Sequence, residues 1–254
     1  MPALFVGHGS PMNAIEDNPF TRAWADLAAR IPRPKAVLCI SAHWQTQGIA
    51  VTSSPEPPTI HDFRGFPQAL ADVRYPAPGH AQFATQLQTM LAMFRVRLDA
   101  QRGLDHGAWS VLVKMYPQAD VPVVQLSMDL TQKPTFHYNV GRMLAPLRDA
   151  GVLILGSGNI VHNLGLLNPQ ETAAPLWARH VNEQVKKKIE GRDHRALIDF
   201  EKLDPDIALA VPSAEHFLPL LYVLGVQDAN EQATFFNDRI VMGAIAMTGV
   251  AIGI

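Results

Sequence analysis

The sequence predicts an α/β fold: a single domain with a mainly parallel or mixed sheet, helices on both faces and a metal site at the strand carboxyl ends. Short apolar segments alternate with amphipathic ones, which is typical of a parallel sheet covered by helices. The 254 residues suffice for one large domain, and no linker or repeat divides them. Three apolar segments, residues 3–6, 37–40 and 152–155, are each followed closely by a histidine.

In the first half of the chain, the apolar segments predict buried strands and the amphipathic segments predict helices. Asn18 and Pro19 are typical of a helix start, with asparagine as the cap and proline in the first turn. The expected strands are residues 3–6, 37–40, 48–52 and 96–98, and the expected helices are residues 19–30, 79–94 and a short one ending at 115. Residues 53–67 contain four prolines, and we expect them to form a packed loop over the site.

The second half continues the alternation. Pro122 indicates that the strand at residues 121–126 starts there or lies at an edge. Ser213 is a plausible cap for a helix that opens at residues 213–216, and Gly191 is expected to close another. The other expected elements are helices 135–148 and 173–190, strand 152–155, and closing β segments at 234–236, 240–242 and 244–252.

Composition excludes several classes of protein. Apolar residues make up 48% and charged residues 17% of the chain, and the net charge is −2. Nothing here indicates nucleic acid or an anionic membrane as a partner. The apolar segment 243–254 is too short to span a bilayer, and no signal peptide is evident. The lone Cys39 lies in an apolar segment and forms no internal disulfide, so we expect a core residue in a cytoplasmic protein. For the oligomeric state we expect a monomer or a small homo-oligomer.

His8, His43 and His162 stand apart from the other histidines. Each follows a predicted buried strand, and in an open α/β sheet ligands bind outside the carboxyl ends of the strands. Small neighbours such as Gly7 and Gly9 are expected to let the backbone approach a bound ion. The three side chains therefore predict one metal site. Sites rich in imidazole and poor in carboxylate or thiolate suit zinc or iron.

The remaining histidines fall into two groups. His216, at a predicted helix start, is either a fourth ligand or a helix cap. His106 can exchange protons near neutral pH, with Asp105 as the residue that would orient it, and His61 lies on the loop expected to line the site. We expect structural or surface roles for the histidines in helical and polar segments, namely His80, His137, His180 and His194.

Seven short motifs, in the same order and nearly from end to end, resemble the 4,5-DOPA extradiol dioxygenase family. That family is similar to the catalytic subunits of class III extradiol ring-cleavage dioxygenases. The motifs are Gly7-His8-Gly9-Ser10-Pro11, Ser41-Ala42-His43-Trp44, Ile60-His61-Asp62-Phe63, Tyr75-Pro76-Ala77-Pro78-Gly79, Asp105-His106-Gly107, Ser157-Gly158-Asn159-Ile160-Val161-His162-Asn163 and Glu215-His216-Phe217-Leu218-Pro219-Leu220.

The resemblance implies that residues 1–254 form one extradiol-dioxygenase-like catalytic domain, an oxidoreductase for aromatic ring cleavage. Its substrate would be a small catechol such as DOPA, and both atoms of O₂ would enter the product, a muconic semialdehyde. One mononuclear divalent metal ion per chain, Zn²⁺ or Fe²⁺, is implied. The residues implied as its ligands are His8, His43, His162 and His216, with His106 as a catalytic acid and base beside them.

The resemblance leaves the metal and its last ligand open. The ring-cleaving dioxygenases hold Fe²⁺ with two histidines and a glutamate, so Glu215 competes with His216 for the C-terminal ligand position. A set of histidines favours bound zinc, whereas the oxygenase reaction requires iron. The loop residues His61 and Phe63 are expected to contact the substrate. Arg64 or Arg74 would pair with a substrate carboxylate, unless both are solvated surface residues.

Two alternatives remain at this stage. The first is a zinc-dependent hydrolase on the same fold, in which zinc-bound water attacks an ester or amide. The second is a metal-binding protein without oxygenase activity. The predicted loop and His106 count against the second alternative, because a protein that only stores metal needs neither.

Overall fold

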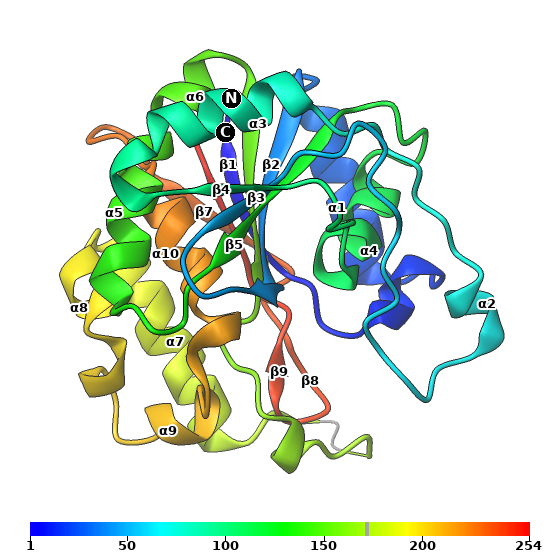
Figure 1. Ribbon diagram of the computed structural model, residues 1–254. Coiled ribbons are helices and arrows are strands. Elements are labelled where there is room, and N and C mark those ends of the chain that lie inside the picture. Colours follow the sequence, from blue (N-terminus) through cyan, green and yellow to red (C-terminus); the bar gives the residue numbers. More distant parts are fainter. Residues whose placement is uncertain (171–172) are drawn as a thin grey trace.

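The computed structural model of the chain describes residues 1–170 and 173–254, and it centres on an eight-stranded mixed sheet (Figure 1). The strand order is β4-β3-β5-β2-β6-β1-β10-β7. The four central strands β5, β2, β6 and β1 run parallel, whereas β3 is antiparallel to β5, and β10 is antiparallel to both β1 and β7. The predicted α/β fold with a mainly parallel or mixed sheet is therefore confirmed. The strands are β1 (Ala3–Gly7), β2 (Ala36–Gln45), β3 (Ala50–Thr52), β4 (Arg97–Asp99), β5 (Val123–Met128), β6 (Val152–Gly158), β7 (Ala233–Phe236) and β10 (Gly249–Ile252), with a separate hairpin of β8 (Ile240–Val241) and β9 (Ile245–Ala246).

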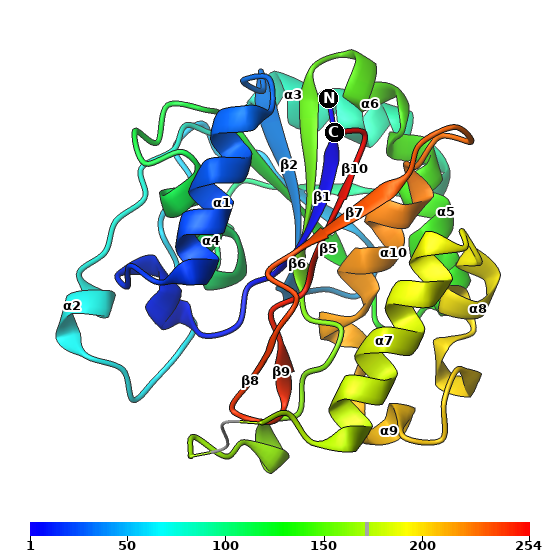
Figure 2. The same ribbon diagram turned by 180° about the vertical axis from the view of Figure 1, so that it is seen from behind.

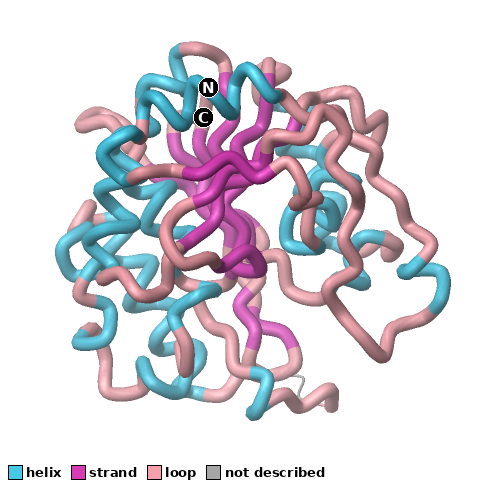
Figure 3. The backbone as a smooth tube through the Cα atoms, in the orientation of Figure 1, coloured by secondary structure: helices cyan, strands magenta, loops and turns pink. Residues whose placement is uncertain are grey.

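Helices cover both faces of the sheet, as predicted. Helices α1 and α4 lie on one face, and α3, α5, α7 and α10 lie on the other (Figures 1 and 2). Figure 3 shows the strands at the centre of the molecule, with helices and loops around them. No helix in the described ranges is long and apolar enough to cross a membrane. The α-helices are α1 (Pro19–Arg30), α2 (Gln68–Ala71), α3 (Ala81–Met90), α4 (His106–Met115), α5 (Pro134–Leu144), α6 (Pro146–Asp149), α7 (Leu176–Glu190), α8 (His194–Ile198), α9 (Ile207–Ala210) and α10 (Leu218–Gly225). Short 3₁₀ helices are η1 (Pro11–Ala14), η2 (Ala92–Phe94), η3 (Leu164–Leu166), η4 (Phe200–Lys202) and η5 (Ala214–His216).

Two hydrophobic cores, one on each face, follow from the alternation of side chains along the central strands. In β2, Leu38 and Ile40 pack into the core beneath α5 and α10, whereas Val37 and Cys39 pack into the core beneath α1 and α4. All four side chains are fully buried, as continuous apolar strands in a covered sheet should be. The position of Cys39 in this core confirms it as a core residue, and burial raises the pKa of its thiol.

The start of α1 matches its prediction. The side chain of Asn18 accepts hydrogen bonds from the backbone N–H groups of Phe20 and Thr21, at 3.0 Å each, and the Thr21 hydroxyl accepts one from the N–H of Asn18. This reciprocal pair is a capping box. Pro19, which has no N–H to satisfy, occupies the first turn.

One predicted helix was wrong in its extent. The single helix expected at residues 135–148 is divided into α5 and α6, because Pro146 cannot donate a backbone hydrogen bond within a continuous helix. The prediction that Gly191 closes another helix is confirmed, because α7 ends at Glu190 and Gly191 is its C-cap, with a right-handed φ of −75°. The strand expected from residue 121 begins at Val123, just after Pro122.

Candidate metal centre

The carboxyl end of β6, which lies between β2 and β1, holds histidines that come from distant parts of the chain. The backbone N–H of His8 donates to the carbonyl of Gly158 at 3.1 Å, and the ring Nδ1 of His8 lies 3.0 Å from Ser157 Oγ. The N–H of Asn159 donates to the carbonyl of His216 at 2.9 Å. Ser157, Gly158 and Asn159, at and just after the end of β6, therefore hold His8 and His216 in place. Both histidines lie at the carboxyl ends of the strands, where the sequence predicts the site.

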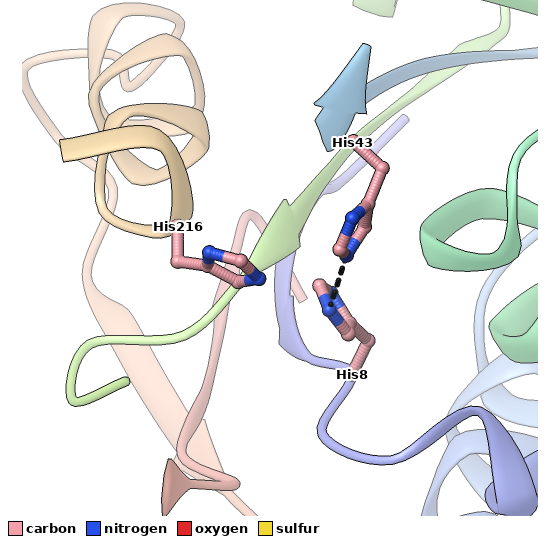
Figure 4. A group of neighbouring side chains, drawn as sticks. All are labelled: His8, His43 and His216. Atoms are coloured by element: carbon pink, nitrogen blue, oxygen red, sulfur yellow. Dashed lines mark hydrogen bonds between the residues drawn. The ribbon is translucent and has the colours of Figure 1, made fainter. Parts of the chain in front are cut away.

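His8, His43 and His216 point toward one another from the end of β1, from β2 and from η5 (Figure 4), with His8 directly after the last residue of β1. Their ring centroids are 5.0, 5.4 and 5.1 Å apart. Rings that bind one ion through nitrogens at about 2.0–2.1 Å have centroids roughly 4.5–5.5 Å apart. The two Nε2 atoms of His8 and His43 are 3.1 Å apart, and one ligand nitrogen from each of the three lies within 4.8 Å of the others. The trio has the geometry of ligands around one point.

The outer ring nitrogens determine which atoms face that point. Ser157 Oγ donates to the carbonyl of Gly107 at 2.6 Å, so it accepts the hydrogen bond from His8 Nδ1, and the Nε2 of His8 carries the lone pair. His216 Nδ1 donates to Glu215 Oε1 at 3.1 Å. His216 Nε2 is buried and has no hydrogen-bond partner in the described part of the chain. A metal ion would satisfy this orphaned lone pair, so the residues present fit a divalent metal.

Electrostatics keep these rings neutral. Burial, followed by the neighbouring histidines, holds the pKa of His8 well below its usual range and lowers that of His43 to about 2. Burial also lowers the pKa of His216. Neutral imidazole is the form that binds metal. The hydrogen bond from His216 lowers the pKa of Glu215 to about 2, so this carboxylate is ionised and accepts the Nδ1 proton.

His162 is placed differently from the trio. Its ring stacks on that of His216, with centroids 3.5 Å apart and an angle of 10° between the ring planes. Its backbone N–H donates to the carbonyl of Ala210. Ligand atoms of His162, Glu215 and His216 form a second close group, which shares His216 with the trio but contains neither of the other two histidines.

His106 is the first residue of α4, and Asp62 holds it. Asp62 Oδ1 accepts hydrogen bonds from both the backbone N–H of His106, at 3.0 Å, and its ring Nδ1, at 2.9 Å. The prediction that Asp105 orients His106 was wrong. The Asp105 carboxylate caps α4 through the N–H of Ala108 and accepts from Ser41 Oγ at 2.6 Å, so it is committed elsewhere.

The ring of His106 lies beside the trio. Its centroid is 3.9 Å from that of His43 and 5.7 Å from that of Phe63, which packs edge-on against it. His61 lies one layer further out: its ring is 5.7 Å from Phe63, and its Nε2 bonds to the carbonyl of Val73 at 3.0 Å. Of the two loop residues expected to contact substrate, Phe63 is therefore the nearer to the histidines.

The loop of residues 53–67 is packed against α4, as predicted. Its Ile60 donates to the carbonyl of Leu104 and accepts from Trp109 Nε1 at 2.8 Å. The guanidinium of Arg74 donates to two nearby backbone carbonyls and is exposed, and Arg64 is exposed as well. The structure thus favours the surface role for both arginines.

Glycines near His8 and His216 lie in close contact with other segments of the chain. A Cβ on Gly7 would lie 2.6 Å from the carbonyl carbon of Met247, and one on Gly158 would overlap the carbonyl oxygen of His216. Gly9 has a left-handed φ of 59°, which suits glycine. These glycines let protein segments approach one another closely.

The other histidines make structural hydrogen bonds, as expected. His80 caps α3 through the N–H of Phe83, the buried His137 bonds the hydroxyl of Tyr222, His180 pairs with Asp204, and His194 lies between Tyr138 and Gln227. Ser213, expected as a helix cap, makes no cap hydrogen bond and donates instead to Glu215.

Asp62 and Ser157 are the site residues that the sequence did not reveal. Each lies in one of the quoted motifs, which is the only signal that could have drawn attention to it. Their partners are 44 and 149 residues away in the chain, and no local pattern encodes such a pairing. The roles of both residues depend on the folded sheet.

Comparison with known proteins identifies the family. The sequence model described as the catalytic LigB subunit of aromatic ring-opening dioxygenase matches residues 2–251. The chain belongs to this family. This match confirms the resemblance that the seven motifs indicate. As a member of the LigB family, the chain belongs to the extradiol ring-opening dioxygenases, which are oxidoreductases. Enzymes of the LigB family usually use a divalent metal, Fe²⁺, and the histidine trio offers a place for one.

Similar proteins and a similar solved structure agree with this assignment to the LigB family. A 4,5-DOPA dioxygenase extradiol from Escherichia coli (strain K12) is 48% identical over 259 residues, covering 100% of this chain and 95% of the relative. A protein of the same name from Beta vulgaris is 38% identical over 242 residues, covering 92% and 90% of the two chains. The crystal structure of an uncharacterized protein from Escherichia coli K12 superimposes with a TM-score of 0.88, 42% identity and full coverage of both chains.

Proposed function

We propose that this chain opens the ring of a catechol that carries an amino-acid side chain, such as DOPA, and inserts both atoms of O₂ to give a muconic semialdehyde. The family supports ring opening, and the names of the relatives from Escherichia coli and Beta vulgaris support DOPA as the substrate. The observation that carries the proposal is the near-equal spacing of the rings of His8, His43 and His216. The buried, free Cys39 supports a reducing, cytoplasmic location.

His8, His43 and His216 would hold Fe²⁺, which when bound supplies electron transfer between catechol and O₂ and favours loss of the hydroxyl protons. The protein must then receive and return a proton. His106 Nδ1 is bonded to Asp62, and its Nε2 has no hydrogen-bond partner in the ranges that the structure describes. His106 Nε2 would take a catechol proton and later return it to one oxygen atom of O₂ as the O–O bond breaks, and both oxygen atoms then enter the product. Such help is worth about 10²–10⁴-fold in rate.

The apolar wall beside His106 binds the aromatic ring and limits access of water. Phe63 contributes the face next to His106, and the rings of His61 and Trp109 support Phe63 from behind, at 5.7 and 6.1 Å. Edge-to-face contacts of this kind suit a catechol ring. His162, stacked on His216, is the second imidazole available for proton transfer.

One experiment tests the reaction. Anaerobic apoprotein is loaded with Fe²⁺ or with Zn²⁺ and then given DOPA and oxygen. Oxygen uptake and a yellow product with iron only would support the proposal. Hydrolysis of a model ester by the zinc form, without oxygen uptake by the iron form, would replace it with the hydrolase. Metal binding with neither activity would indicate a metal-binding protein without oxygenase activity.

A pair of variants tests the residue roles. His43→Ala should abolish stoichiometric metal binding, because the trio then lacks one of its three nitrogens. His106→Ala should retain the metal and lose turnover. His180→Ala, whose imidazole pairs with Asp204 away from the trio, is the matched control and should keep both properties. Loss of metal from His106→Ala would show that the assignment of ligands is wrong.

A further inference from the structure

We propose that Asp62 is a positioning residue: it sets the tautomer and the orientation of His106, so that Nε2 of this histidine faces the substrate. The inference rests on the proposed function, in which His106 moves the catechol proton. Asp62 lies on the loop between β3 and α2, 44 positions before His106 in the sequence.

Asp62 bonds to both the backbone and the ring of His106. One oxygen, Oδ1, accepts from the N–H at the first position of α4 and from ring Nδ1, at 3.0 and 2.9 Å. Two bonds to one residue fix the ring relative to its own backbone. The His106 side chain is 8% exposed, so the ring has little room to adopt another orientation.

The same bonds determine the tautomer. Asp62 Oδ1 accepts from the backbone N–H of His106, which can only donate, and the same oxygen lies 2.9 Å from ring Nδ1. An ionised carboxylate only accepts hydrogen bonds, so His106 Nδ1 carries the proton. The lone pair of neutral His106 is therefore on Nε2, the nitrogen that a proton acceptor at the site requires.

The second oxygen of Asp62 faces the trio. Oδ2 lies 4.0 Å from Nδ1 of His43, which is too far for a direct hydrogen bond. The next residue, Phe63, packs edge-on against the His106 ring. Two consecutive loop residues thus hold His106 from two directions, one through hydrogen bonds and one through packing.

A second cation is the competing interpretation of this cluster. His43, Asp62 and His106 offer three ligand atoms within 4.8 Å of one another. We favour the positioning role because Oδ1 of Asp62 already accepts two hydrogen bonds, and because His43 also belongs to the trio. The stoichiometry of bound metal decides between the two interpretations.

The test compares three substitutions. Asp62→Ala removes both hydrogen bonds. Asp62→Asn keeps an oxygen that the backbone N–H of His106 holds in place, so the Nδ1–H tautomer should persist. Asp72→Ala is the matched control, since the Asp72 carboxylate is exposed at the end of α2 and bonds only to Gln68 among the contacts described.

The first readout is independent of activity. In ¹⁵N NMR spectra of histidine-labelled, zinc-loaded protein, His106 should be protonated on Nδ1 in the wild type, in Asp62→Asn and in Asp72→Ala. In Asp62→Ala it should become a mixture in which the Nε2–H tautomer is substantial. An unchanged tautomer in Asp62→Ala would overturn the proposal. So would two bound metal ions per chain in the wild type that fall to one in Asp62→Asn.

The second readout is turnover of DOPA by the iron form. We expect kcat of Asp62→Ala to fall about 100-fold, with KM changed by less than about threefold. The kcat of Asp62→Asn should be at least about tenfold higher than that of Asp62→Ala. A kcat within about threefold of Asp72→Ala would contradict the positioning role. If the wild type does not turn over any catechol, the proposed function fails, while the NMR comparison still decides the role of Asp62.

Discussion

His162 and His216 stack face to face, with ring centroids 3.5 Å apart and an angle of 10° between the planes. Rings bound to one ion diverge from it, and their centroids are about 4.5–5.5 Å apart. His162 and His216 are thus too close and too parallel to bind one ion together through radiating nitrogens. We infer that the trio of His8, His43 and His216 binds metal without His162, although the resemblance predicts four ligands.

Removal of His216 should therefore weaken metal binding much more than removal of His162. His216→Ala should lower the affinity for Zn²⁺ by about 100-fold or more, and His162→Ala by less than about tenfold. Isothermal titration of the apoprotein with Zn²⁺ measures both values. Equal losses in the two variants would restore His162 as a fourth ligand.

Gly158→Ala should damage the site without touching a ligand side chain. Its new Cβ would overlap the carbonyl oxygen of His216, which accepts a hydrogen bond from Asn159. We expect a loss of about 1–3 kcal/mol in the free energy of unfolding and at least about tenfold weaker metal binding. Gly165→Ala, where the nearest atom to the new Cβ is a side-chain oxygen at 3.3 Å, is the control, and urea unfolding should show the contrast.

Stability of the apoprotein should fall as the pH drops below about 6.5. Burial lowers the pKa of His43 to about 2, that of His162 to about 3 and that of His137 to about 4, from an ordinary value of 6.5. Below 6.5 the unfolded chain binds protons that the folded chain does not, so the free energy of unfolding decreases. Each such histidine contributes up to about 1.4 kcal/mol per pH unit. Thermal unfolding between pH 7.5 and 5 measures this, and a constant Tm would contradict it.

Replacement of the buried Arg148 by alanine should lower the free energy of unfolding more than replacement of an exposed arginine. The Arg148 guanidinium donates to Glu231 Oε2 at 2.7 Å and to the carbonyls of Val226 and Met1, at 2.8 Å each, and its side chain is 8% exposed. Arg148→Ala would leave Glu231 without its partner, at a cost of about 3 kcal/mol. The control Arg22→Ala breaks an ion pair whose side chains are 61% and 75% exposed, and it should cost less than about 0.5 kcal/mol.

The central sheet could be predicted because its strands are buried on both faces. A segment such as residues 37–40 is continuously apolar for that reason, and it is recognisable without any tertiary information. The order of the strands was not predictable in the same way. That β10 pairs antiparallel with β1, with Ile252 opposite Ala3, depends on pairing between the two ends of the chain, which hydrophobicity alone does not specify.

Some residues of the candidate site could likewise be predicted from the sequence, and others could be recognised only in the folded structure. His8 and His43 could be found because each directly follows or ends an apolar strand, and α/β sheets bind ligands at that edge. Asp62 could not, because its function exists only through contact with His106. The roles of the remaining histidines also required structure: His162 and His216 look alike in sequence, and only the stacking of their rings separates them.

The end of β6 links metal capture to the order of folding. Ser157 and His8, which meet there, are 149 residues apart in the chain, so closing that contact costs entropy and is slow compared with local helix formation. The trio is incomplete until β1, β2, β6 and η5 have all docked. A nascent or partly folded chain thus presents single, weakly binding imidazoles, and tight retention of metal marks the molecules that have completed the sheet.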